Sequence, residues 1–282
     1  MGLQLALDTE VATIDKERGR YRAHLAERWE TWGPNGGYLA SVALRAAGAT
    51  TTLSHPATLS CLFLAAGRLD AVDVTVTRLR SSTRSEAMHV EVRQDDRALL
   101  VGHVWAVDGE LAGFEHEVAT APAVMPPVDG TWPAQGFRNE FWRRNFEIRT
   151  ATASDLAASG PSDIHWMRFL GDAALVRDPW VDACRAVVLV DTTQWPAANR
   201  HHQGGDGEVA FVAPNIDLDV RFHRAAPSNE WLLVEAASPV AERGLIAGLV
   251  RVWATDGRLV ASGSSHMLCR QVPVGTPGSG TQ

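Results

Sequence analysis

The sequence predicts an α+β fold in which one helix and a run of antiparallel strands occur twice. Two observations lead to this prediction. Each half of the 282-residue chain has one clear helical stretch, at Trp32–Ala49 and at Asp178–Thr192, and each helical stretch is followed by long segments of strand-forming residues. Because a helix beside an antiparallel meander can bury its apolar face against the sheet, each half is expected to form its own core.

The first helix is expected to begin after Asn35, a residue type suited to a helix N-cap. Tyr38, Val42 and Ala46 follow at helical spacing, and Gly48 is a plausible end. Before the helix, Arg20–Trp29 alternates like a strand. The strands expected after it are Ala57–Leu64, Asp70–Leu79, Ser85–Gln94 and Ala98–Val107.

The second half repeats this order. Phe141–Arg149 is strand-like, and Asp178 and Pro179 are typical N-cap and first residues of the second helix. Asp256-Gly257 predicts a hairpin between the last two strands. The strands expected after the helix are Ala210–Arg224, Trp231–Ala237, Leu245–Ala254 and Leu259–Arg270.

These elements divide the chain into two domains of similar size. We expect an N-terminal domain at residues 1–108 and a C-terminal domain at residues 139–272. The stretch between them, 109–138, is rich in Pro, Gly and Ala and reads as a linker. Residues 273–282 are expected to form a disordered tail.

Composition narrows the classes of function. With 33 acidic and 26 basic side chains, the net charge is −7, which argues against nucleic acid or an anionic membrane as a partner. The N-terminus lacks the features of a signal peptide, and the apolar runs are too short to span a bilayer. Cys61, Cys184 and Cys269 are widely spaced and are expected to be reduced thiols of a cytoplasmic protein. His201-His202 has no third spaced ligand, so no metal or cofactor is expected.

Four segments carry a resemblance to a known family. Trp32–Ala40, Ile216–Arg224, Glu230–Leu233 and Asp256–Ser262 resemble, in order and spacing, segments of the TesB-like acyl-CoA thioesterases. The resemblance extends from about residue 20 to 270. It implies a double hotdog fold, in which two long helices are each wrapped by an antiparallel sheet. It also implies hydrolysis of acyl-CoA thioesters in lipid metabolism without metal or covalent cofactor, and further association into a dimer or tetramer.

The resemblance also implies a set of residues that orient the attacking water. The family's Asp falls on Asp217, its Thr or Ser on Ala237 or Ser238, and its Gln on Ser265. The serine at the last position is a departure, because a hydroxyl can bind water but lacks the reach of the amide. Alternation along the strand places Asp217 on the same face as Asp219, which leaves a solvated face or an ion-pair network as the other interpretation.

The start of the first helix is the expected binding point for the thioester oxygen. Backbone N–H groups at a helix N-terminus, aided by the helix dipole, can polarise a carbonyl, and Gly36 and Gly37 would allow a close approach. The alternative is that both glycines only permit tight packing. Asn35 could cap the helix or contact the ligand, and Trp32 and Tyr38 are expected beside them in the substrate site.

Two further features have open interpretations. Arg78 ends a strand with other arginines nearby, a cluster that is either a solvated edge or a contact for CoA phosphates. The ten tryptophans are either core residues or, at Trp29, Trp32, Trp180 and Trp195, parts of an acyl pocket.

Two other functions remain open beside hydrolysis. The departure at Ser265 is compatible with a hotdog protein that binds acyl-CoA without cleaving it. Another hotdog enzyme of a lipid or polyketide pathway, such as a dehydratase, is the third candidate. The absence of a Gly-x-Ser-x-Gly motif argues against a Ser-His-Asp hydrolase.

Overall fold

The computed structural model describes residues 4–132, 137, 139–151, 161–171, 178–199, 202, 209–227 and 229–273. The tail expected to be disordered lies outside these residues, apart from Pro273. Among the described residues, no helix combines the length and the apolar character needed to cross a membrane.

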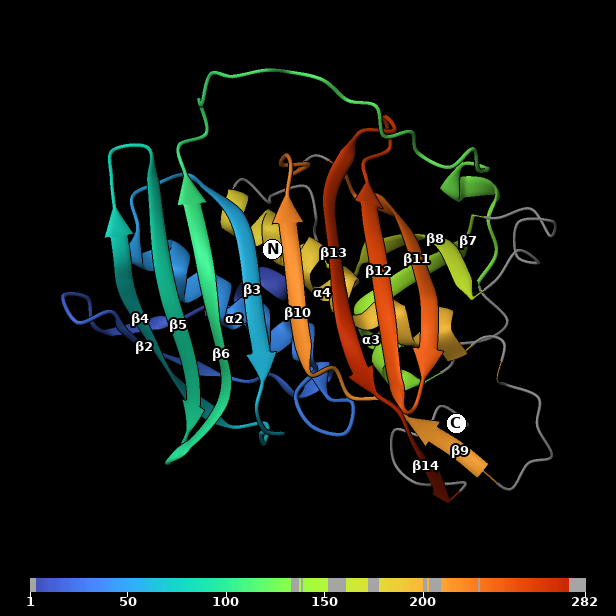
Figure 1. The fold of residues 1–282 in the computed structure, drawn as a ribbon, viewed down its shortest axis with the longest axis horizontal. Helices are drawn as coiled ribbons and strands as arrows, with labels where there is room; N and C mark the ends of the chain where they lie inside the picture. Colours follow the sequence, from blue (N-terminus) through green and yellow to red (C-terminus); the bar gives the residue numbers. More distant parts are fainter. Residues whose placement is uncertain are drawn as a thin grey trace.

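One antiparallel sheet of twelve strands forms the body of the molecule, in the order β1-β2-β4-β5-β6-β3-β10-β13-β12-β11-β8-β7 (Figure 1). A separate pair, β14-β9, lies at one end. The strands are β1 (Ala12–Asp15), β2 (Arg20–His24), β3 (His55–Phe63), β4 (Ala71–Ser81), β5 (Ser85–Gln94), β6 (Arg97–Val107), β7 (Phe146–Thr150), β8 (Ser162–Phe169), β9 (Val209–Val212), β10 (Asp217–Phe222), β11 (Trp231–Glu242), β12 (Leu245–Trp253), β13 (Leu259–Leu268) and β14 (Arg270–Pro273).

Two long helices lie against one face of this sheet, one behind each half in Figure 1. The helices of the chain are α1 (Gln4–Asp8), α2 (Gly36–Thr50), α3 (Glu140–Asn145) and α4 (Pro179–Asn199), with short 3₁₀ turns at Glu27–Trp29 and Pro127–Asp129. The half-sheets join where β3 pairs antiparallel with β10, with Leu59 opposite Val220. This is the double hotdog arrangement, so the predicted α+β fold is confirmed.

Both long helices begin where the sequence predicts. The side chain of Asn35 accepts a hydrogen bond from the backbone N–H of Tyr38 at 2.9 Å, and that of Asp178 accepts one from Trp180 at 2.8 Å. These bonds satisfy N–H groups that have no partner within the helix.

The long helices pack closely on each other. Ser41 Oγ donates to the carbonyl of Cys184 at 3.4 Å, and Cys184 Sγ donates to the carbonyl of Ser41 at 3.7 Å. The predicted helix end at Gly48 is wrong, because α2 continues to Thr50. Gly48 instead makes room for Trp180: a Cβ at Gly48 would lie 2.6 Å from the indole ring.

Four other predicted elements differ from the structure. The second helix, expected over Asp178–Thr192, continues to Asn199. The strand expected over Arg20–Trp29 ends at His24 and is followed by the 3₁₀ turn Glu27–Trp29. The expected strand Phe141–Arg149 begins as helix α3, which Asn139 caps by accepting from the N–H of Trp142. The expected strand Ala210–Arg224 is divided into β9 and β10, because β9 leaves the main sheet to pair with β14.

The described part of the expected linker, 109–132, contains no helix or strand apart from the 3₁₀ turn Pro127–Asp129 and runs over the edge of the sheet from β6 towards the second half (Figure 1). It is anchored on the second half. Glu117 accepts hydrogen bonds from Arg224 at 2.7 Å and from the N–H of Leu259 at 2.9 Å, and the carbonyl of Met125 accepts from Trp166 at 2.8 Å.

Candidate active site

A buried carboxylate, Asp191, lies where the start of α2 packs on α4. Asp191 is 5% exposed and occupies the fourth turn of a helix that is buried almost throughout. An acidic side chain in such a position needs hydrogen-bond donors to compensate for its lost hydration.

Three donors surround this carboxylate. Asn215 Nδ2 donates to Asp191 Oδ1 at 2.6 Å, and Asn35 Nδ2 donates to Oδ2 at 3.2 Å. The backbone N–H of Gly37 is the third. Burial raises the pKa of the Asp191 carboxyl to about 6, and the three hydrogen bonds act in the opposite direction. A carboxyl with this pKa is ionised at neutral pH and is basic enough to take a proton, as a general base requires.

The two glycines bring the start of α2 against this carboxylate. A Cβ at Gly37 would lie 2.7 Å from Asp191 Cβ and 2.8 Å from Val188 Cα, and one at Gly36 would lie 2.8 Å from Asp191 Oδ1. Both glycines are therefore required for close helix packing. The same contact places Asp191 beside the N–H groups at the positive end of the α2 dipole.

Asn215 connects this carboxylate to Ser265. Ser265 lies on β13, is 2% exposed, and its Oγ is 3.3 Å from Asn215 Oδ1. Asn35, Gly37 and Ser265, three residues that the sequence singles out, are thus brought together around Asp191.

Asp217 lies on the other side of the sheet. In β10, Leu218 and Val220 are fully buried on the helix side, which turns Asp217 to the outer face. There the carboxylate of Asp217 accepts from the N–H of His266 at 2.6 Å and lies 3.2 Å from the Nδ1 atom. The structure therefore does not bring Asp217 together with Ser265.

Ser238 is separated from Ser265 by one strand. Gly248 of β12 pairs with Ser265 of β13, and β11, which carries Ser238, pairs with the other side of β12. Two strand spacings amount to about 10 Å. Ser238 is 4% exposed, and its neighbour Ala237 pairs with Leu249.

Of the other expected substrate contacts, Tyr38 and Arg78 make their side-chain hydrogen bonds away from Asp191, and Trp32 is partly exposed. Tyr38 is fully buried, with its hydroxyl donating to the carbonyl of Asp8 at 2.6 Å and accepting from the N–H of Ala26 at 3.0 Å. Burial raises the pKa of its phenol to about 12. Trp32 is 46% exposed. Arg78 binds the carbonyl of Thr50, at the opposite end of α2.

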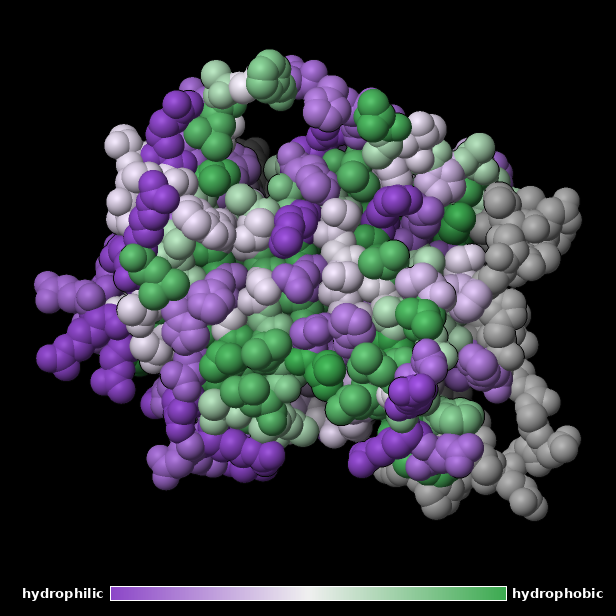
Figure 2. Space-filling model, in the orientation of Figure 1, coloured by the Kyte–Doolittle hydropathy of each residue, from purple (hydrophilic) through white to green (hydrophobic). Residues whose placement is uncertain are grey.

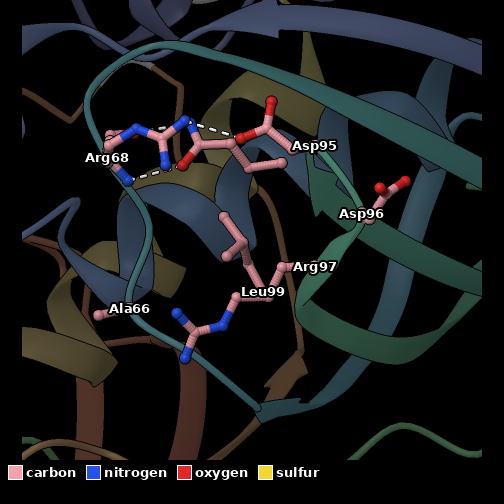
Figure 3. Close-up of a pocket in the computed structure, with 7 residues that line it drawn as sticks. Ala66, Arg68, Asp95, Asp96, Arg97 and Leu99 are labelled. Atoms are coloured by element: carbon pink, nitrogen blue, oxygen red, sulfur yellow. Dashed lines mark hydrogen bonds and ion pairs between the residues drawn. The ribbon is translucent and has the colours of Figure 1, made fainter.

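A surface depression of about 420 Å³ lies between the β5–β6 hairpin and the segment Ala66–Arg68 (Figure 3). Arg68 and Arg97 line it together with Asp95 and Asp96, and Arg68 pairs with Asp95 at 2.8 Å. The charges of the lining are balanced, so the depression has no excess of cations for an anionic ligand.

Two residues of this site were missed in the sequence. Asp191 ends the apolar run Val187–Val190 of the second helix, and an acidic residue on a helix expected to be wrapped by a sheet is a usable signal. Asn215 precedes the predicted Asp217 by two positions and has no local signal of its own. In the described part of the chain, no group of three or more His, Cys, Asp or Glu side chains is placed to hold a metal ion.

The fold and this site define a double hotdog protein with one buried carboxylate at the contact between its two long helices. Models of the acyl-CoA thioesterase N-terminal domain and of the acyl-CoA thioesterase C-terminal domain match residues 25–107 and 119–266. The chain belongs to the acyl-CoA thioesterase family, whose members are thioester hydrolases.

Solved structures share the fold across nearly the whole chain. The acyl-CoA thioesterase II TesB2 of Mycobacterium marinum is 21% identical with a TM-score of 0.79, covering 96% of this chain and 100% of that one. A TesB protein of Mycobacterium avium subsp. paratuberculosis is 22% identical with a TM-score of 0.75, covering 94% and 98%. The dehydratase domain of PpsC from Mycobacterium tuberculosis, in complex with C12:1-CoA, is 13% identical with a TM-score of 0.51, covering 93% and 97%.

Proposed function

We propose that this chain hydrolyses acyl-CoA thioesters at the start of α2, with Asp191 as the general base. The observation that carries the proposal is the buried Asp191 carboxylate, which Asn215 and Asn35 hold beside the N–H groups of the helix start. Asp191 takes the role that the sequence analysis gave to Asp217. Asn215 and Ser265 orient the water, and Ser238 has no part in this arrangement.

The reaction uses the groups as follows. Asp191 removes one proton from a water molecule while the water oxygen bonds to the thioester carbonyl carbon. The N–H groups of Gly37 and Tyr38 are bound by Asp191 and Asn35. The negative charge that develops on the carbonyl oxygen is therefore stabilised at the N-terminal end of α2 by the N–H of Gly36 and the helix dipole. The intermediate then expels the CoA thiolate, and the proton held by Asp191 passes to the sulfur. The products are a carboxylic acid and free CoA.

The test compares two carboxylates. Free CoA release from acyl-CoA of several chain lengths is measured for the unaltered chain, for Asp191→Asn and for Asp217→Asn. We expect Asp191→Asn to lower kcat by a factor on the order of 10²–10⁴, the usual contribution of a general base. Asp217→Asn is the matched control, a carboxylate on the opposite sheet face.

Three outcomes would contradict the proposal. Full activity of Asp191→Asn, with loss of activity in Asp217→Asn, would restore the assignment made from the sequence. Saturable acyl-CoA binding without CoA release would instead indicate a binding protein. Conversion of the acyl chain with the thioester left intact would indicate a dehydratase or a related enzyme.

We also propose that the protein works in the cytoplasm in lipid metabolism and that two or four copies associate. The three cysteines are free, which supports a reducing compartment. Hydrophobic side chains gather on the outer sheet face over the ends of β3 and β13 (Figure 2), where Leu62, Leu64 and Leu268 are about half exposed. Light scattering that detects only monomer at micromolar concentration would reject the association.

The domain boundaries predicted from the sequence are kept in this proposal. Residues 1–108 would form the first hotdog domain and residues 139–272 the second, with 109–138 between them. The second domain would supply the general base on α4, and the first would supply the helix start that binds the thioester oxygen.

A further inference from the structure

A carboxamide from α4 reaches Ser265. Gln194 follows Asp191 by one helical turn and is fully buried. Its Nε2 donates to the carbonyl of Val190 at 2.7 Å, and its Oε1 accepts from Ser265 Oγ at 2.7 Å. Since Ser265 Oγ also faces Asn215, a continuous polar path runs from Asp191 through Asn215 and Ser265 to Gln194.

The neighbouring strand leaves space for this carboxamide. Gly248 of β12 pairs with Ser265, and a Cβ at Gly248 would lie only 1.7 Å from Gln194 Oε1 and 2.5 Å from Gln194 Cδ. Any other residue at Gly248 would push Gln194 away from Ser265. A glycine inside a strand weakens the strand and often marks a close approach of another group, which here is the carboxamide.

The donor and acceptor roles along this path follow from the chemistry of each group. A serine hydroxyl has one proton to donate and two lone pairs that accept. The nitrogen of the Gln194 amide is held by the Val190 carbonyl, so its oxygen is the atom that faces Ser265. Ser265 Oγ has two acceptors within reach, Gln194 Oε1 at 2.7 Å and Asn215 Oδ1 at 3.3 Å. The nearer acceptor, Gln194, directs the single proton away from Asn215, so the lone pairs of Ser265 Oγ are left to accept on the Asp191 side.

We propose that Gln194 is a positioning residue that makes Ser265 a hydrogen-bond acceptor for the attacking water. The inference rests on the proposed function. A water held between Ser265 and Asp191 would donate one O–H to the serine and the other to the carboxylate. Its lone pairs then point towards the thioester carbon. Without Gln194, the Ser265 hydroxyl can rotate and donate to Asn215 Oδ1 instead, which turns its lone pairs away from the water and removes this orientation.

The test uses Gln194→Met, which keeps the length of the side chain and removes the amide, and Ser265→Ala, alone and combined. We expect each single variant to lower kcat about tenfold or more while KM changes less than threefold. Because Gln194 acts through Ser265, the double variant should be within twofold of Ser265→Ala. Thr193→Val is the matched control. Thr193 is the adjacent buried residue of α4, its hydroxyl donates to the Leu189 carbonyl at 2.7 Å, and kcat should stay within twofold.

A further variant covers the case in which Gln194→Met does not fold. Gly248→Ala keeps every polar group and displaces the carboxamide, so it should lower kcat as Gln194→Met does.

The outcomes separate this inference from the proposed function. If the unaltered chain releases no CoA, the proposed function fails. If it does release CoA and Asp191→Asn abolishes the release, the inference is tested by itself. Unchanged kcat in Gln194→Met, or effects of Gln194→Met and Ser265→Ala that multiply in the double variant, would overturn it.

Discussion

Asp191 shows how one side chain balances two opposing electrostatic effects. Burial disfavours its charged form and raises the pKa of the carboxyl from 3.8 to about 6, whereas its three hydrogen-bond donors favour the charged form. With only burial, the carboxyl would be neutral at pH 7 and could not take a proton. With the same donors at an exposed site, it would be too weak a base. The structure places it between these limits.

The pKa of Asp191 predicts the pH dependence of activity. Since the proposed base must be ionised, kcat/KM should fall as the pH decreases through about 6 and reach a plateau above pH 7. The measurement is the rate of CoA release between pH 4.5 and 9, after confirming that the protein stays folded at each pH. A profile that is flat down to pH 4.5 would show that no group with this pKa is required.

At the scale of elements, the contact between α2 and α4 forms the site. Gly37 is the residue of this contact that tolerates a larger side chain least, because an added Cβ would meet Asp191 Cβ and the backbone of Val188. Side-chain atoms can rotate away from an added methyl group, but a helix backbone cannot. The start of α2 can therefore approach Asp191 only with glycine at this position.

Gly37→Ala should consequently reduce both stability and activity. The added Cβ forces the helices apart, which costs about 1–3 kcal/mol of the free energy of unfolding, as for other overpacked sites. The displaced N–H of Gly37 also leaves Asp191. Urea unfolding and the CoA-release assay measure the two effects. Gly113→Ala is the control, because nothing lies within 4 Å of a Cβ there, and it should change stability by less than about 0.5 kcal/mol.

Local patterns predicted the elements well and the site only in part. The alternation in Ser85–Gln94 and the capping residues Asn35 and Asp178 act within a few positions, so the predicted element and caps are confirmed. Gly48 shows the limit, since a glycine can end a helix or admit a neighbouring side chain, and only the position of Trp180 decides between them.

The candidate carboxylate illustrates the same limit at the site. The apolar residues Leu218 and Val220 already placed Asp217 on the face opposite the core, so the sequence contained the argument against it. The signal of an acidic residue on the second helix applies to both Asp182 and Asp191, so the helix alone does not select Asp191. Its surroundings come from Asn35 and Asn215, which are 156 and 24 positions away in the chain.

At the scale of the whole molecule, the two halves are related by an approximate two-fold relation that the site does not obey. Ser41 and Cys184 exchange equivalent hydrogen bonds, which marks the centre of the helix pair. Trp180 follows its cap Asp178 as Gly37 follows Asn35. Gly37 of α2 packs on Asp191 of α4, and Gly48 of α2 packs on Trp180 of α4 at the equivalent contact, which we call the second position. There the indole of Trp180 takes the place of Gly37, and Gly48 takes the place of the Asp191 carboxylate.

Two of the tryptophans, Trp180 and Trp29, are core residues. Trp180 is 6% exposed and fills the second position, with its indole N–H donating to the Leu53 carbonyl at 3.4 Å. Trp29 is 1% exposed, stacks on Tyr38 with ring centroids 5.3 Å apart, and donates to Asp8 at 2.8 Å. Both indoles are used in packing and hydrogen bonding within the protein.

The asymmetry predicts one substrate site per chain, although the fold has two equivalent helix starts. Titration calorimetry of the Asp191→Asn chain with an acyl-CoA analogue whose thioester is replaced by a stable thioether should give one ligand per chain. Trp180→Ala should not add a second site, because Gly48 provides no carboxylate there. It should lower the free energy of unfolding by about 3–5 kcal/mol through the cavity that it leaves. Two ligands per chain in either variant would show that the second helix start also binds substrate, and the indole of Trp180 would then have to move aside when the ligand enters.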